Sequence, residues 1–139
     1  MLFRSCGLVQ ARLGAVSGAS AYFLGGVTAY SLEQKVNLLG IDGAHARKVN
    51  SVSRIVAEEM ARGACALYGS DLAVATTGYA EPSPAHGVKT PMAWWALCHR
   101  QKGRAIVVRT GRLEFKGARR GQMQAAVTAA VLLDRKSVV

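Results

Sequence analysis

Three residues that could together hydrolyse an amide lie within sixteen consecutive positions of this chain, from Ser20 to Lys35. Ser20 offers a hydroxyl nucleophile, Tyr30 a phenol and Lys35 an amine. A serine hydroxyl attacks poorly at neutral pH unless a base takes its proton, and a lysine can be that base when its surroundings favour the neutral amine. A tyrosine can relay the proton. The same three residues also fit a capping serine, a packed tyrosine and a solvated lysine.

The residues around these three resemble the CinA C-terminal domain family, the nicotinamide-nucleotide amidohydrolases. The most specific block runs from Gly18 to Ser31 and continues with Lys35 and Leu38-Leu-Gly-Ile41. Three later segments also match family patterns, the last of them weakly: Val52 to Gly63, Thr77 to Pro82, and Phe115 to Arg119.

This resemblance implies a serine/lysine-type amidase of bacterial pyridine nucleotide (NAD) salvage, which converts nicotinamide mononucleotide to nicotinate mononucleotide and ammonia. Ser20 would attack the carboxamide and form an acyl-enzyme, with Lys35 as general base and Tyr30 as the bridge between them. The roles of Tyr30 and Lys35 could be exchanged. Arg119 would bind the phosphate, and no cofactor would be needed.

The substrate pocket is expected at loops next to strand ends, where open α/β sheets bind ligands. Gly25 and Gly26 would let the ligand approach closely, although a glycine pair that permits tight packing is as good an interpretation. Thr77 and Gly78 would line the pocket, and the alternative for Thr77 is a turn hydroxyl that satisfies the backbone.

Two departures from the family pattern leave other functions open. Glu81 stands where the family has a glycine, and Ala118 where it has an aspartate. They motivate a nucleotide-binding homologue that has lost turnover. A basic nucleic-acid-binding module is a further alternative because of the charge distribution, although no recognisable binding motif supports it.

The two ends of the chain do not match the family. The family has a strand ending in an ESCTGG segment before its first helix, and here only residues 1–7 precede that helix. Residues 1–5 and 134–139 read like translated sequencing adapters. We therefore expect a single domain over residues 6–133 that lacks the leading strand and is marginally stable or prone to aggregate.

Composition favours one globular domain without a membrane segment. The 139 residues are 50% hydrophobic and 19% charged, which is ordinary for globular proteins. Cys6, Cys65 and Cys98 show no paired spacing, and the three histidines stand far apart. This pattern argues against a disulfide framework and a metal site and favours the reducing cytoplasm.

The chain is strongly basic, with a formal net charge of +10, or +8 without residues 1–5 and 134–139. The segment from Lys89 to Arg120 contains nine basic residues and a single acidic one, Glu114. Most of them fit a solvated face, but the field would also favour a phosphate-bearing small molecule. We thus expect a nucleotide substrate as partner, and homo-oligomers remain open.

Helices and strands are expected to alternate and to form a three-layer α/β/α sandwich with a mixed sheet. The helices are expected at Leu8–Leu13, from a cap at Ser51 or Ser53 to about Leu67, and at Gln122–Leu133. The strands are expected at Gly25–Tyr30 and Asp71–Thr76, followed by a loop over Gly78–Pro91, the apolar run Met92–Cys98, and a hairpin that turns at Thr110-Gly111 between Ala105–Arg109 and Arg112–Phe115.

Overall fold

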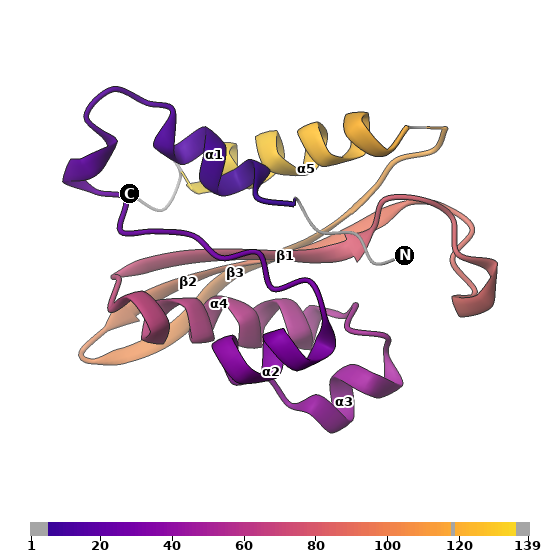
Figure 1. The fold of residues 1–139 in the computed structure, drawn as a ribbon, viewed down its shortest axis with the longest axis horizontal. Coiled ribbons are helices and arrows are strands. Elements are labelled where there is room, and N and C mark those ends of the chain that lie inside the picture. Colours follow the sequence, from indigo (N-terminus) through magenta and orange to yellow (C-terminus); the bar gives the residue numbers. More distant parts are fainter. Residues whose placement is uncertain (1–5, 118, 136–139) are drawn as a thin grey trace.

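The chain folds into three layers, with helices on both faces of a β-sheet (Figure 1). The computed structural model describes residues 6–117 and 119–135. One face is covered by α1 (Leu8–Gly14) and α5 (Arg120–Arg135). The other face is covered by α2 (Leu32–Leu39), α3 (Gly43–Lys48) and α4 (Arg54–Tyr68). The α/β class expected from the sequence is confirmed.

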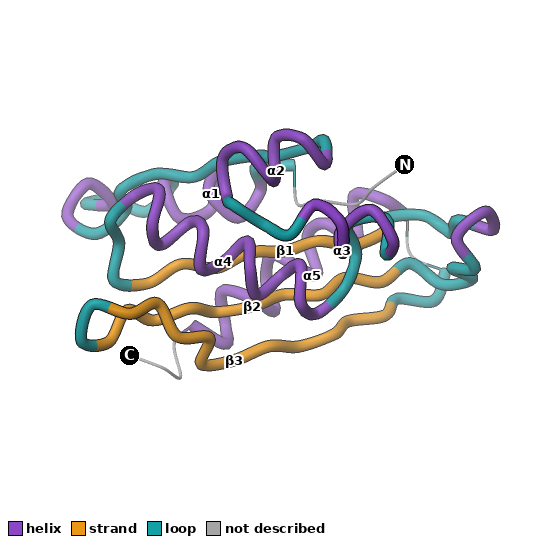
Figure 2. Tube along the Cα trace, turned by 90° about the horizontal axis from the view of Figure 1, so that it is seen from below, coloured by secondary structure: helices purple, strands orange, loops and turns teal. Residues whose placement is uncertain are grey.

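The described sheet has three strands in the order β1 (Leu72–Tyr79), β2 (Met92–Gln101), β3 (Arg104–Glu114), as Figure 2 shows. Both pairings are antiparallel. The expectation of a mixed sheet is therefore wrong for the described residues. Two short 3₁₀-helices, η1 (Ala19–Ala21) and η2 (Pro84–His86), lie in the connections.

The hairpin between β2 and β3 turns at Lys102 and Gly103 and not, as the sequence analysis expected, at Thr110-Gly111. Both turn residues have positive φ, 49° and 77°, which suits a two-residue turn with the twist of the flanking strands. Gly111 instead lies inside β3 opposite Trp95, where a Cβ would meet the indole at 2.4 Å. This glycine makes room for a ring and does not turn the chain.

The strand expected at Gly25–Tyr30 is not formed. Residues 23–30 run along the length of the sheet without helix or strand structure and connect η1 to α2 (Figure 1). An apolar cavity of about 900 Å³ is lined both by this run and by β1 residues 72–76. No β-bridge between the two is found among the described residues.

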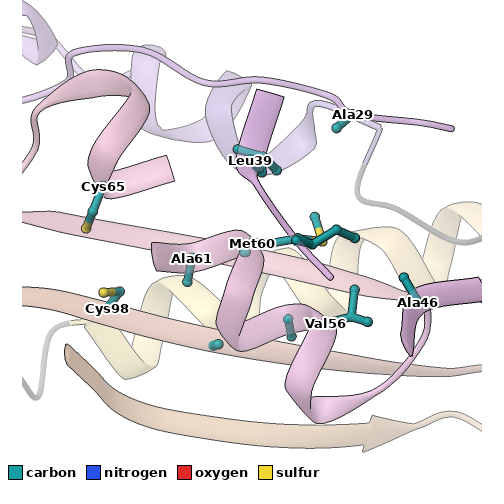
Figure 3. Packing of buried hydrophobic residues seen from close by; sticks show 12 residues of the cluster. Ala29, Leu39, Ala46, Val56, Met60, Ala61, Cys65 and Cys98 are labelled. Atoms are coloured by element: carbon teal, nitrogen blue, oxygen red, sulfur yellow. The ribbon is translucent and has the colours of Figure 1, made fainter. Parts of the chain in front are cut away.

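Alternation along the strands divides the core into two clusters, because successive side chains point to opposite faces. On β2, Ala96 and Cys98 face α4, while Ala93, Trp95 and Leu97 face α5. Figure 3 shows the first cluster, in which α4 side chains fill the space between α2 and the sheet. The described residues thus pack a hydrophobic core on each side of the sheet.

Helix α4 begins where the sequence predicted. Ser53 is its N-cap and accepts a hydrogen bond from the Val56 amide at 3.1 Å. Val56 and Met60 are buried, whereas Leu67, at the far end of the helix, is 47% exposed. Three further residues on the buried face of α4 are small, and they let the helix lie close to the sheet: Ala57, Ala61 and Cys65.

Helices α2 and α3 were not predicted. The signal for α2 is a capping-box pattern, since Ser31 caps the helix by accepting a hydrogen bond from the Gln34 amide at 3.2 Å. Gly40 ends α2 in the left-handed conformation, with φ 63°. Asp42 caps α3 by accepting hydrogen bonds from the backbone amides of Ala44 and His45. Within the described residues no helix is long and apolar enough to cross a membrane.

The contact between α4 and α2 predicts a stability difference between two glycine substitutions. A Cβ at Gly63 would lie 2.0 Å from the Leu39 carbonyl oxygen, whereas one at Gly121 in α5 would meet nothing within 4 Å. We expect Gly63→Ala to lower the free energy of unfolding by about 1–3 kcal/mol through overpacking. Gly121→Ala should raise it by about 0.5–1 kcal/mol through helix propensity. Urea unfolding measures both, and equal effects would contradict this packing.

The thiols of Cys65 and Cys98 lie against each other in the core between α4 and β2 (Figure 3). Burial, and then the neighbouring Cys65, raise the pKa of the Cys98 thiol from 9.0 to about 12. Because of this raised pKa, the Cys98 thiol stays neutral in the folded protein at a pH where it already ionises in the unfolded chain. This contribution to stability is present below pH 9 and is lost as the pH rises toward 12.

We expect one reactive thiol in the native protein, because thiol reagents attack the exposed thiolate. Cys6 is exposed, while Cys65 and Cys98 are buried. Ellman's reagent at pH 8 should titrate one thiol quickly and all three in denaturant. Cys6→Ser should abolish the fast phase. A fast phase that survives in Cys6→Ser would show that the α4–β2 core opens.

Candidate functional site

Lys35 is the centre of the candidate site, and its side chain is fully buried, with a relative exposure of 0%. It projects from α2, and its Nζ donates hydrogen bonds to the Thr77 hydroxyl at 3.3 Å and to the Ser51 carbonyl at 3.5 Å. A buried lysine is unusual unless its amine is well bonded. The solvated-lysine interpretation is thereby excluded.

Thr77 and Ser51 form the other side of this centre. The Thr77 hydroxyl, on β1, is fully buried and donates to the Ser51 carbonyl at 2.6 Å. Ser51 and the preceding Asn50 both have positive φ, 60° and 51°, which non-glycine residues rarely adopt. The Thr77 hydroxyl thus donates a hydrogen bond to a backbone carbonyl of this turn, which fits its alternative interpretation as a hydroxyl that satisfies the backbone. It also accepts the hydrogen bond from Lys35.

Next to this centre, at the end of β1, lies a depression of about 450 Å³. Asn50 donates to the Tyr79 hydroxyl at 2.9 Å, and the Tyr79 ring lies 5.9 Å from the His86 ring. Lys89 and Arg112 add positive charge to its lining. Arg112 is itself paired with Glu114 and lies over the Trp94 ring, so much of its charge is already satisfied.

Tyr30 lies just before Ser31, the N-cap of α2, and five residues before Lys35, and it is 42% exposed. The pKa of Arg120, at the start of α5, is raised above its usual value, chiefly by the Tyr30 phenol, and Cys6 and the charge of Glu81 act in the same direction.

Ser20 is not brought to Tyr30 and Lys35 in this structure. It lies in η1 and is exposed, and among the described residues its hydroxyl has no hydrogen bond to either side chain. The eight residues 23–30 separate η1 from α2 and span up to roughly 26 Å when extended. The sequence placed these residues near one another in the chain, but the straight run between them holds Ser20 away.

The predicted glycines have packing roles. A Cβ at Gly25 would meet the Tyr68 ring at 2.6 Å, and one at Gly26 would meet the Gln10 side chain at 2.2 Å. A Cβ at Gly78 would meet the Met92 carbonyl oxygen on β2 at 2.3 Å. The tight-packing interpretation of Gly25 and Gly26 thus fits the structure, and whether any of the three glycines touches substrate stays a prediction.

Arg119 is the residue before α5. Its backbone amide donates to the Gln122 side chain at 2.9 Å, and its side chain is exposed. Sequence reasoning missed Ser51 as a neighbour of Lys35. The capping-box pattern at Ser31 could have placed Lys35 on a helix that begins just after Tyr30, but no local signal brings Ser51 or Thr77 to Lys35.

Across the described residues, no group of three or more His, Cys, Asp or Glu side chains could hold a metal ion. The site centre is the amine of Lys35 with the hydroxyl of Thr77 and the carbonyl of Ser51. An amine and a hydroxyl can donate and accept protons.

A family model, the CinA C-terminal domain, matches residues 4–138. The chain belongs to this family. A CinA-like protein of Chlorobium limicola is 41% identical over 129 residues, which cover 90% of this chain and 29% of that protein. One of Mycolicibacterium vanbaalenii is 38% identical over 134 residues, covering 96% and 31%. The chain therefore spans less than a third of the length of these curated relatives.

Solved structures of the CinA family have the same fold. The competence damage-inducible protein A of Klebsiella pneumoniae superposes with a TM-score of 0.82 at 27% identity, covering 96% of this chain and 80% of that one. The CihA protein of Agrobacterium tumefaciens also gives a TM-score of 0.82, at 24% identity, covering 96% and 79%, and at that identity it supports the fold alone.

The Thr77 hydroxyl predicts a matched pair of variants of this CinA-type domain. Thr77→Val removes the donor to the Ser51 carbonyl and an acceptor for Lys35, so we expect it to lower the free energy of unfolding by about 1–3 kcal/mol. Thr77→Ser keeps the hydroxyl and should lose clearly less. Urea unfolding at pH 7 distinguishes them. Equal losses would mean that the methyl group and not the hydroxyl stabilises this contact.

Proposed function

We propose that this CinA-type domain is an amidohydrolase of the cytoplasm that removes the carboxamide nitrogen of nicotinamide mononucleotide, giving nicotinate mononucleotide and ammonia. Family membership supports a CinA-type function, and the names of the relatives do not extend to this reaction. The observation that carries the proposal is the buried amine of Lys35, which is hydrogen-bonded to a hydroxyl and projects from a helix that begins just after Tyr30.

Amide hydrolysis needs a base to activate the attacking oxygen and an acid to protonate the leaving nitrogen. Burial in general favours the neutral amine of a lysine, and a neutral amine can act as the base. Lys35 would take the proton of the attacking oxygen and return it to the departing nitrogen. Tyr30, beside the solvent-accessible end of the site, would relay that proton, and Thr77 would hold the lysine in place.

Two groups could supply the attacking oxygen in this mechanism, the Ser20 hydroxyl and a water molecule. Ser20 could serve only if η1 moved to the site, because residues 23–30 separate the two in this structure. A water activated by Lys35 needs no such movement and is the simpler choice. The position of Ser20 also favours a second candidate function, a nucleotide-binding homologue without turnover.

The proposal predicts which substitutions stop the reaction. Lys35→Met keeps much of the buried volume and removes the base, and we expect ammonia release from nicotinamide mononucleotide to fall by at least about 100-fold. Tyr30→Phe should lower kcat by about 10- to 100-fold, through loss of the proton relay. Ser20→Ala should stay within about twofold. Coupled ammonia detection gives kcat and KM for each.

Two outcomes would change the assignment. If Ser20→Ala abolished turnover while its unfolding curve stayed that of the wild type, then η1 would reach the site and Ser20 would be the nucleophile. If the wild type bound the nucleotide but released no ammonia, the non-catalytic homologue would be correct. Thermal unfolding of each variant excludes a simple loss of the fold.

A further inference from the structure

The depression at the end of β1 takes no part in the mechanism proposed above, and its side chains suit a charged ligand. Its volume of about 450 Å³ lies within the roughly 300–1,000 Å³ that is typical of small-molecule pockets. We infer that this depression binds the phosphate of the nucleotide substrate, and that Lys89, and not Arg119, supplies the cation that holds it. The inference rests on the proposed function for the identity of the nucleotide.

The depression combines apolar and charged side chains. Met92 and Tyr79 are buried in its lining, whereas Lys89 and Arg112 are exposed. A mononucleotide has the matching character, because it carries a planar ring at one end and a phosphate at the other. The pyridinium ring of nicotinamide mononucleotide would also be attracted to the face of a tyrosine.

Lys89 is the cation of this lining whose charge is not already balanced. Arg112 is paired with Glu114 and lies 6.0 Å from the centre of the Trp94 ring. For the Lys89 side chain, no hydrogen bond or ion pair is found within the part of the chain that the structure describes. A phosphate therefore gains most from Lys89, because this charge-assisted contact breaks no existing one.

The loop that carries Lys89 is closed by its own hydrogen bonds. Ser83 and Val88 exchange two backbone hydrogen bonds, of 2.8 and 3.0 Å, and Lys89 follows directly. The Ser83 hydroxyl lies 2.8 Å from Nδ1 of His86, whose ring lies against Tyr79. With the serine as donor, the proton of the neutral imidazole lies on Nε2, which can then donate to a phosphate oxygen. Two donors are thus placed before the ligand arrives, which lowers the cost of binding.

A single turn links the depression to the Lys35 amine. The Asn50 side chain donates to the Tyr79 hydroxyl, and the carbonyl of the next residue, Ser51, accepts from Lys35 and from Thr77. Thr77 and Tyr79 stand two positions apart on β1, so they lie on the same face of the sheet and about 7 Å apart along the strand. A nucleotide held by its phosphate at Lys89 would therefore lie beside the centre that contains the proposed base.

Arg119, to which the family resemblance assigned the phosphate, is not among the described residues that line this depression. It precedes α5, which covers the opposite face of the sheet from α3 and α4 (Figure 1). The lining instead includes Val49, which follows α3, and Val52, which precedes the cap of α4.

Calorimetric titration of the whole chain tests the inference with two ligands that differ by the phosphate, nicotinamide mononucleotide and nicotinamide riboside. At low ionic strength, Lys89→Gln should weaken binding of the mononucleotide by about five- to tenfold and leave binding of the riboside within about twofold. Lys102→Gln is the matched control. It removes the same charge from the turn at the other end of β2, about 30 Å from Met92, and should leave both affinities within about twofold.

Glu114→Gln should act in the opposite direction. It removes a repelling carboxylate from the lining and releases Arg112, so we expect binding of the mononucleotide to tighten by about two- to fivefold at low ionic strength. The gain should vanish at high salt, because both groups are exposed and screened.

The inference fails if Lys89→Gln and Lys102→Gln lose equal affinity, because the general field of the chain would then explain the effect. An equal loss for both ligands in Lys89→Gln would also overturn it, as would a loss confined to Arg119→Gln. Ammonia release separates the two proposals. A wild type that binds the mononucleotide through Lys89 but releases no ammonia would overturn only the amidohydrolase proposal, whereas turnover with an unchanged KM in Lys89→Gln would overturn only this inference.

Discussion

The burial of the Lys35 amine is the constraint on which the site depends. An amine taken out of water must be hydrogen-bonded, and its acceptors here come from two other segments, Thr77 on β1 and the carbonyl of Ser51. These bonds fix α2 against the sheet and hold the turn at Ser51 in a conformation with positive φ. The local strain of that turn is balanced by the hydrogen bonds it receives.

Close packing makes this burial feasible. Gly63 lets α4 approach the end of α2, and the alanines of α4 let the helix lie close to the sheet. With larger side chains at these positions α2 would be pushed outward, and Lys35 would lose its contact with Thr77. The small residues of the core therefore help to position the Lys35 amine and also stabilise the fold.

The sequence predicted those parts of the fold whose signals are local. Ser53 caps α4 as expected, and the layers follow from the alternation of elements. The expected turn at Gly111 is not formed, because this glycine instead makes room for the ring of Trp95 on the neighbouring strand. The expected strand at Gly25–Tyr30 failed for a similar reason, since its glycines accommodate Tyr68 and Gln10 and the segment does not pair with β1.

The same distinction explains the candidate site. Tyr30 and Lys35 were predicted as a pair because they lie close in the sequence, on either side of the serine that caps α2, and their joint role stays a prediction. The nearness of Ser20 in the sequence did not place it at Lys35. The acceptors of the Lys35 amine lie 16 and 42 residues further along the chain, so no short sequence pattern encodes them. The base that we propose lies on a helix with local sequence signals, whereas the groups that hold its amine come from a turn and a strand. Short motifs can therefore identify such a lysine more readily than the residues that position it.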